Sequence, residues 1–337
     1  MEETTKAPKV SRFEWAWCLA FVLAAVVVLG ILGNIFRPVH TTYGSTWDAF
    51  LAEPKDSIDV LFLGSSYAYC DWNPGVMYSE SGLTGYVMAG GEQTMGVSYY
   101  TLKEALKTQS PSVVVMEGAP LFFAPYQSYT KINVGYMPWG LNKVGAILEY
   151  AEPELRTGLF FDLYFYHDRW KELTGADLKK ALPQRRTDAL KGYTAVEGVF
   201  VSETGVPAVS GVMRSEEDYA ANLKTFRRIA QLCEQEGIDL IVTMNPTYGQ
   251  FTKEMYDRFG SDVLAAGADR YVCWADAFDE IGLDASKHLY DGDHLNREGA
   301  VVFSRFTGRY LRDLGYGPRP QSEENARAWE ETAEYWN

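Results

Sequence analysis

The stretch Ile58-Asp-Val-Leu-Phe-Leu-Gly-Ser-Ser66 decides the fold. It is a short apolar run that ends in glycine and two serines, the pattern of a buried strand followed by a tight turn. Similar runs recur at 85–91, 111–117, 238–244 and 270–274. Helical patterns span 94–109, 215–237 and 296–314. Strands that alternate with helices predict an α/β domain whose parallel sheet is flanked by helices.

The alternation is interrupted between about residue 120 and residue 213, a stretch rich in Tyr, Phe and Trp. Helical patterns within it lie at 139–151 and 158–174, and we interpret the stretch as a helical insertion over the face of the sheet. Its aromatic cluster around 159–167 indicates packing on the core or on a membrane partner, with sugar stacking as the alternative.

A second unusual segment runs from Trp15 to Phe36 without one charged side chain. As a helix it extends about 33 Å, enough to span a bilayer, and tryptophans at one end are typical of the membrane interface. The alternatives are a buried core helix and a cleaved signal peptide. The run is too long for the apolar part of a signal peptide, and Arg37 and Pro38 follow it instead of a cleavage site. We expect an uncleaved transmembrane helix.

The basic residues near this helix predict its orientation. Lys6, Lys9 and Arg12 precede it, whereas Arg37 and Lys55 follow it. This small excess favours a cytoplasmic N-terminus and an extracytoplasmic domain. We therefore expect five segments: a cytoplasmic tail at 1–14, the transmembrane helix at 15–36, a linker at 37–57, the α/β domain at 58–316 and a peripheral acidic tail at 317–337.

Composition excludes several classes of protein. The 337-residue chain has a net charge of −14, which argues against nucleic acid as a partner because phosphate binding needs a basic face. Four cysteines do not make a disulfide scaffold, and no His/Cys cluster has zinc-ligand spacing. Phosphate-binding glycine motifs are absent from the sequence. We expect no metal and no cofactor.

Two short segments carry residues suited to catalysis. Gly64-Ser65-Ser66 follows the first strand, at the edge of the sheet where sites form in α/β proteins. Asp291 and His294 lie three residues apart in a turn before the last helix. This spacing lets the carboxylate hold one imidazole nitrogen while the other faces a serine. The two serines could instead serve only as a turn or a helix cap. Cys70 is a second candidate nucleophile, with a buried thiol as the alternative.

Together, these segments resemble the SGNH (GDSL-like) hydrolase superfamily. That resemblance implies a three-layer, flavodoxin-like fold with Ser66 as nucleophile, His294 as general base and Asp291 as the orienting acid. Ser65 and Asp293 are the near alternatives. The resemblance also implies that two backbone N–H groups bind the oxyanion. One belongs to Ser66, and the other belongs to a glycine in 89–91, for which we prefer Gly91.

The third motif of that superfamily departs from its pattern. A Gly-x-Asn-Asp segment is expected after the third strand, where this chain has Met116-Glu117-Gly118. An anionic Glu117 does not stabilise an oxyanion as an amide does, and Asn245, after a later strand, is a weak substitute. The departure argues against efficient hydrolysis and leaves the Ser/His/Asp core.

The string Tyr290-Asp-x-x-His-Leu-Asn-x-x-Gly-Ala300 is similar to a membrane-anchored branch of the superfamily. That branch includes the teichoic-acid D-alanyl transfer protein and alginate O-acetylation proteins. The resemblance implies a membrane-bound O-acyltransferase (MBOAT) as partner and a cell-surface polysaccharide or teichoic acid as substrate.

Three functions follow from these observations. The first is a membrane-anchored serine acyltransferase or esterase that forms an acyl-enzyme on Ser66. The second is a non-catalytic accessory protein that scaffolds an acyltransferase. The third is a simple extracellular deacetylase.

Overall fold

The computed structural model describes residues 12–39, 46–181, 188–200, 215–247 and 251–336. Contacts divide the chain into two compact units. The smaller unit joins Met1–Val39 with Thr157–Gln184, and the larger joins His40–Arg156 with Arg185–Asn337. Two of the boundaries fall inside the stretch that interrupts the strand–helix alternation, so the middle of that stretch belongs to the smaller unit and its two flanks belong to the larger unit.

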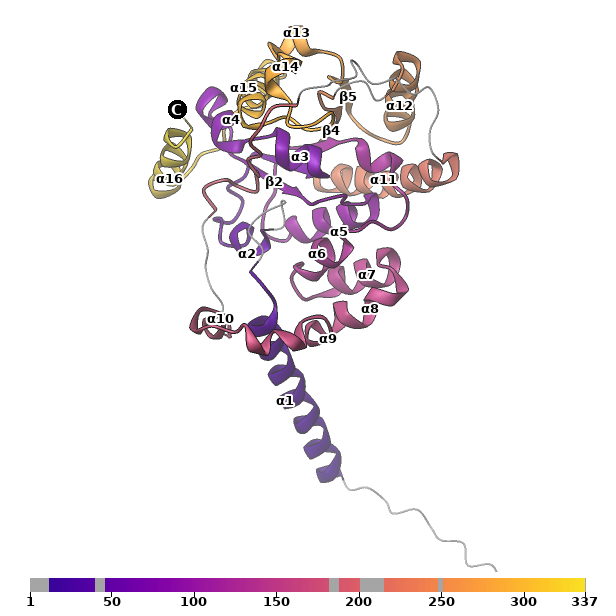
Figure 1. Ribbon diagram of the computed structural model, residues 1–337, viewed down its shortest axis with the longest axis vertical. Coiled ribbons are helices and arrows are strands. Elements are labelled where there is room, and N and C mark those ends of the chain that lie inside the picture. The colour runs from indigo at the N-terminus through magenta and orange to yellow at the C-terminus, as the bar shows by residue number, and fades with distance from the viewer. Residues whose placement is uncertain (1–11, 40–45, 182–187, 201–214, 248–250, 337) are drawn as a thin grey trace, which may run out of the picture. The chain divides into compact units, whose positions relative to one another are not determined.

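In the described part of the larger unit, five parallel strands form one sheet in the order β2-β1-β3-β4-β5 (Figure 1). They are β1 (Val60–Gly64), β2 (Gly85–Ala89), β3 (Val113–Glu117), β4 (Asp239–Met244) and β5 (Arg270–Cys273). Every residue of β1, β2 and β3 is buried, as expected for a parallel sheet covered on both faces. The predicted α/β fold with a parallel sheet is confirmed.

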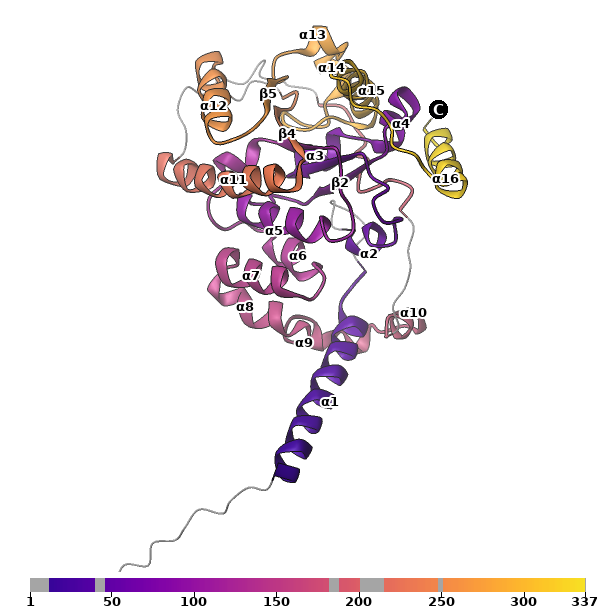
Figure 2. The same cartoon turned by 180° about the vertical axis from the view of Figure 1, so that it is seen from behind.

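Two groups of helices cover the sheet (Figures 1 and 2). One group packs together around the core cluster that contains Trp72 and Phe303: α3 (Ser66–Asp71), α4 (Pro74–Ser81) and α15 (Arg297–Asp313). The other pairs α5 (Met95–Ala105) with α11 (Glu216–Glu236). The C-terminal half also contains α12 (Lys253–Ala265) and two helices of one turn each, α13 (Phe278–Ile281) and α14 (Ala285–His288).

The ends of the long helices follow their capping residues. The Ser215 hydroxyl accepts the Asp218 N–H group at the start of α11, and Gly237, with φ 67°, ends this helix. The Asn296 side chain accepts the Gly299 N–H group and starts α15. Because α15 begins directly after the Asp291–His294 turn, this cap also fixes where that turn lies.

The interrupting stretch contains η1 (Ala119–Phe122), α6 (Thr130–Gly135), α7 (Leu141–Tyr150), α8 (Pro153–Phe160), α9 (Asp162–Tyr166), η2 (His167–Lys171) and α10 (Gly175–Lys179). A single helix over 158–174 was the expectation, and it is wrong. The chain leaves the helical region at Phe161, where φ is −134° and ψ is 87°. Aromatic residues hold a helix weakly, and tertiary contacts of this segment override the periodic pattern.

Both segments that border the predicted α/β domain carry buried side chains. In 37–57, α2 (Trp47–Phe50) buries Trp47 and Phe50. In 317–337, α16 (Glu323–Glu334) packs on α4 and buries Trp329 completely. The Arg319 guanidinium also pairs with the buried Asp59 at 3.0 Å.

The smaller unit is built on α1 (Arg12–Phe36). Among the described residues, α1 alone is long and apolar enough to cross a membrane, and most of it is exposed. By length and composition it fits either a single span or a signal sequence. Its C-terminal end contacts α9, η2 and α10.

The burial of Trp329 predicts that α16 is part of the folded core. We expect Trp329→Ala to lower the free energy of unfolding by about 3–5 kcal/mol, because a buried aromatic side chain leaves a cavity that closes only in part. Urea denaturation of the protein in detergent measures this. Arg327→Ala, an exposed change on the same helix, serves as the control and stays within about 0.5 kcal/mol of wild type. Equal losses in both variants would contradict the packing of α16.

Candidate functional site

The turn after β1 is shaped by close packing against β3. Gly64 has φ +151°, and a Cβ atom there would lie 2.8 Å from the Cβ of Glu117. Only glycine meets both requirements. The chain then passes the fully buried Ser65 and starts α3 at Ser66, which is half-buried. Ser66 therefore lies at the carboxyl edge of the sheet with its side chain near the surface.

The structure brings Ser66, His294 and Asp291 together. The His294 Nε2 atom lies 2.8 Å from the Ser66 Oγ atom, and its Nδ1 atom lies 2.9 Å from Asp291 Oδ2. The Asp291 Oδ1 atom accepts the backbone N–H groups of Asp293 and His294, each at 2.8 Å. The Tyr67 ring stacks on the imidazole with a centroid distance of 5.0 Å. The carboxylate and the imidazole are thus each held from two sides.

The charges at this site favour the protonated imidazole. Burial opposes the charge on His294, but the hydrogen bond and negative charge of Asp291 outweigh it and raise the pKa of His294. Burial also opposes the charge on Asp291, and the hydrogen bonds from His294 and two backbone N–H groups lower the pKa of Asp291. An arrangement of this kind stabilises the imidazolium that forms when a serine is deprotonated.

Ser65, the alternative nucleophile, is bound to a buried carboxylate. Its hydroxyl donates to Glu117 Oε2 at 2.9 Å, and its backbone N–H group points to the same oxygen. The other oxygen of Glu117 accepts the Ala119 N–H group. Burial raises the pKa of Glu117 to about 7, although these hydrogen bonds act in the opposite direction. Glu117 therefore fastens the serine turn to β3, and the Ser65 hydroxyl is directed inward.

A second buried carboxylate, Asp71, was missed in the sequence. It ends α3, and its two oxygens accept the Leu295 N–H group at 3.1 Å and the Asn245 amide at 3.0 Å. Burial raises the pKa of Asp71 to about 8, with His294 among the groups that limit the rise. Because Leu295 follows His294, Asp71 ties the imidazole segment to the helix that begins at Ser66. The only sequence signal was a carboxylate inside an otherwise apolar turn of helix.

Asn245, considered above as a substitute amide, is engaged in this network. Its amide group donates to Asp71 and to the Tyr67 carbonyl oxygen, the latter at 3.4 Å. Its oxygen accepts the Thr243 hydroxyl at 2.9 Å. The amide thus supports the segments around Ser66 and His294.

Gly91 lies in the turn after β2. The sheet register pairs Gly64 with Ala89, so Ser66 and Gly91 each follow this pair by two residues. The Gly91 carbonyl oxygen accepts the Asn133 amide at 2.8 Å, and a Cβ atom on Gly91 would contact the Tyr129 ring at 3.0 Å. Asn133 and Tyr129 therefore hold the turn that follows β2, the strand paired with β1.

The remaining histidines and Cys70 have other environments. His288 accepts the Asp284 N–H group through Nδ1 at 2.9 Å. His167 lies in the smaller unit, and His40 lies outside the described residues. Burial raises the pKa of the Cys70 thiol well above its usual value, so this thiol is neutral. The exposed Asp293 contributes its backbone N–H group to Asp291.

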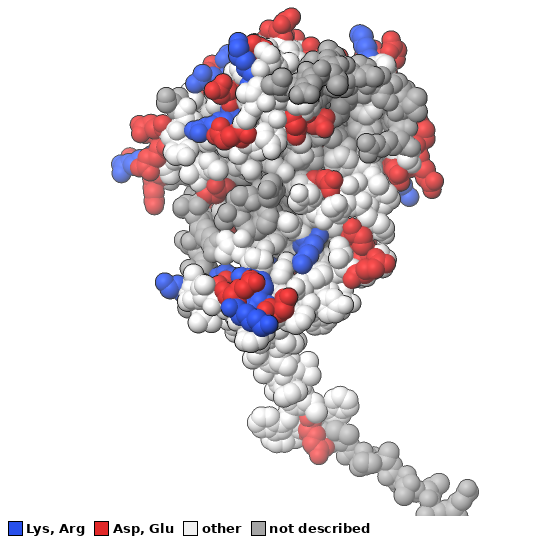
Figure 3. Space-filling view, viewed as in Figure 1, with Lys and Arg blue, Asp and Glu red and all other residues white. Residues whose placement is uncertain are grey.

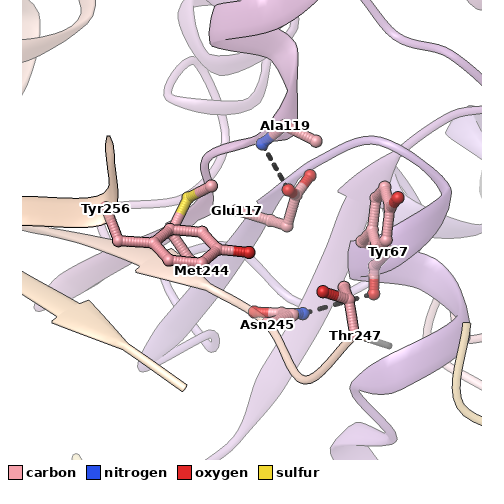
Figure 4. A pocket seen from close by; sticks show the side chains of 7 residues that line it. All are labelled: Tyr67, Glu117, Ala119, Met244, Asn245, Thr247 and Tyr256. Carbon is pink, nitrogen blue, oxygen red and sulfur yellow. Dashed lines mark hydrogen bonds between the residues drawn. The ribbon is translucent and has the colours of Figure 1, made fainter. Parts of the chain in front are cut away.

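A small pocket adjoins this cluster (Figure 4). It encloses about 220 Å³ of empty space, part of it open to solvent, and is lined by Tyr67, Glu117, Ala119, Met244, Asn245, Thr247 and Tyr256. Figure 4 shows the Glu117 carboxylate directed at the Ala119 nitrogen and the Asn245 amide directed at the Tyr67 carbonyl. The pocket therefore borders Tyr67, which follows Ser66 directly, and combines apolar walls with polar atoms.

No protein-family model matches this sequence, and no curated protein matches it significantly.

The raised pKa of His294 predicts a pH dependence. Only the neutral imidazole accepts a proton, so we expect covalent labelling of Ser66 by a fluorophosphonate to accelerate as pH rises through that pKa. In Asp291→Asn the midpoint shifts to lower pH, because burial then acts without the opposing charge, and the maximal rate falls by about 100-fold or more. Stopped-time labelling from pH 5 to pH 9 measures both. An unchanged midpoint in Asp291→Asn would contradict the assigned contact.

The Asp71 network predicts different outcomes for two substitutions. Asp71→Asn resembles the protonated carboxyl, keeps an acceptor for the Leu295 N–H group and is expected to retain labelling near the wild-type rate at pH 7. Asp71→Leu leaves that N–H group and the Asn245 amide without acceptors. It should lower the free energy of unfolding by about 1–3 kcal/mol and slow labelling. If Asp71→Asn were as damaging as Asp71→Leu, the site would require the charge of Asp71 or its second acceptor oxygen, which receives the Asn245 amide.

Proposed function

We propose that this chain is a membrane-anchored serine acyltransferase or esterase of the SGNH type. Its substrates would be acyl esters of a cell-surface polysaccharide or a teichoic-acid-like polymer. Ser66 attacks the acyl carbonyl and holds the acyl group as an ester, which then passes to a hydroxyl group or to water. The observation that carries this proposal is the hydrogen-bonded series from Ser66 through His294 to Asp291.

Each residue of the series has one role in the proposed reaction. His294 Nε2 takes the proton of the Ser66 hydroxyl during attack and gives it to the leaving alcohol. Asp291 keeps the other imidazole proton on Nδ1 and stabilises the imidazolium. The same steps run in reverse order when an acceptor hydroxyl attacks the acyl-enzyme.

Two backbone N–H groups are assigned to the oxyanion. One belongs to Ser66 at the start of α3, and the other belongs to Gly91 in the turn after β2. The matching positions of the two residues along paired strands support this assignment. We place the acyl group beside the pocket lined by Tyr67, Met244 and their neighbours, because Tyr67 follows Ser66 directly.

The third oxyanion donor of the resembled superfamily has no equivalent at Glu117, because that carboxylate already accepts the Ser65 hydroxyl and the Ala119 N–H group. With fewer donors, attack by free water is slow, and we favour transfer to a positioned hydroxyl group. Anchoring by α1 would hold the α/β unit outside the cytoplasm. We also propose an MBOAT partner that supplies the acyl group, on the basis of the resemblance to the membrane-anchored branch.

Fluorophosphonate labelling of the full-length protein in detergent tests the proposal. We expect the wild type to be labelled on Ser66 and both Ser66→Ala and His294→Ala to lose labelling by at least about 100-fold. Peptide mass spectrometry identifies the modified residue.

Ser65→Ala is the matched control, because it removes a neighbouring hydroxyl that donates to Glu117 and should leave the label on Ser66. Absence of labelling in a folded wild-type protein would favour the accessory role. Rapid ester hydrolysis without an added acceptor would favour the simple deacetylase.

A further inference from the structure

The exposed part of α1 has a defined length. From Phe13 to Ile31 the helix is exposed apart from the partly buried Ala25, whereas Gly33 and Ile35 in its last turn are buried. Nineteen residues of helix extend about 28 Å, close to the roughly 30 Å of a bilayer's hydrocarbon core. If this part spans the core, the covered last turn lies at the membrane interface.

The last turn is covered by α9, η2 and α10. These helices and the residues that flank them, Phe161–Lys180, are called the collar. Gly33 permits a close approach, because a Cβ atom there would lie 3.3 Å from the Cβ of Asp162. The Asp162 carboxylate pairs with Arg37 at 3.6 Å. The collar is therefore tied to the point where the helix ends.

Cations of the same segment cap the end of α1. The Arg169 guanidinium donates to the Phe36 carbonyl oxygen, and the Lys180 ammonium donates to the Arg37 carbonyl oxygen. Carbonyl groups at a helix C-terminus lack partners within the helix and interact favourably with positive charge. These contacts satisfy backbone groups that would otherwise be costly to place near lipid.

The outer surface of this segment is aromatic. Its large exposed side chains are Phe161 at 58%, Tyr164 at 62%, Trp170 at 64% and Leu178 at 59% exposure. Trp and Tyr are the residues enriched where a protein crosses between lipid and water. Tyr164 and Trp170, together with the apolar Phe161 and Leu178, therefore form a surface suited to the headgroup region.

The charges of the segment balance and pair. From Thr157 to Ala181 it carries equal numbers of cations and carboxylates, in a chain whose net charge is −14. Asp177 pairs with Lys180 at 2.8 Å and with Arg169 at 3.6 Å. Figure 3 shows red and blue side chains gathered next to the mostly white surface of the N-terminal helix. Paired charges and no net charge remove the repulsion that an acidic surface meets at an anionic bilayer.

We propose that the collar lies in the membrane interface, with Phe161, Tyr164 and Trp170 among the lipid headgroups and upper acyl chains. It sets the depth of α1 in the bilayer. The inference rests on the membrane anchor in the proposed function and is independent of the chemistry at Ser66.

Depth-dependent quenching in liposomes tests this placement. Full-length protein with Cys18→Ser and Cys273→Ser, which removes the exposed thiols, receives a single engineered cysteine carrying an NBD fluorophore. The sites are W170C and Y164C in the collar, V26C inside α1 and K253C on α12 as the aqueous reference. The liposomes contain phosphatidylcholine and phosphatidylglycerol with a nitroxide either near the headgroup or deep in the acyl chain.

We expect W170C and Y164C to show blue-shifted emission and at least about twofold stronger quenching by the shallow nitroxide than by the deep one. V26C should be quenched most by the deep nitroxide, and K253C by neither. If V26C is quenched but both collar sites behave like K253C, the collar does not contact lipid, and the proposed placement is wrong. The collar is then covered by water or by another protein. If V26C is not quenched either, the anchor itself fails. Ser66 labelling in the same liposomes reports on the proposed chemistry separately.

Discussion

The contact between Ser66 Oγ and His294 Nε2 joins two segments that are 228 positions apart in the chain. It forms because β1 ends at Gly64 and the turn before α15 returns to the same edge of the sheet. A parallel sheet sends every strand's carboxyl end to one side, so residues from distant turns converge there. The close approach of Gly64 to Glu117 sets where Ser66 lies, and the Asn296 cap of α15 sets where His294 lies.

Two buried carboxylates hold the segments that carry Ser66 and His294. Glu117 binds the serine turn, and Asp71 binds the segment after His294 together with Asn245. Each carboxylate is costly to bury in its charged form, and the pKa values of about 7 and 8 express that cost. The hydrogen bonds that they accept make their positions specific, since a buried N–H group without an acceptor also carries a penalty. The site is therefore held by a polar network within the α/β unit.

Much of this arrangement follows from local sequence patterns. The five strands, the caps at Ser215 and Asn296 and the α/β class depend on periodicity and on short-range hydrogen bonds, which the sequence displays directly. The proximity of Asp291 to His294 also follows from local spacing. The roles of Asp71 and Glu117 do not, because they depend on which backbone groups lie opposite each carboxylate after folding. The break at Phe161 is likewise not visible in the periodic pattern, and α9, which begins directly after it, contacts α1.

The central claim is that Ser66 forms an acyl-enzyme with the help of His294. The most direct measurement is mass spectrometry of the full-length protein mixed rapidly with an activated acetyl ester and quenched in acid. The account predicts one acetyl group on the Ser66 peptide of the wild type, none in His294→Ala, and its loss when a polyol acceptor is added. An acetyl group on Ser65 or Cys70 instead, or an equal yield in His294→Ala, would contradict the account.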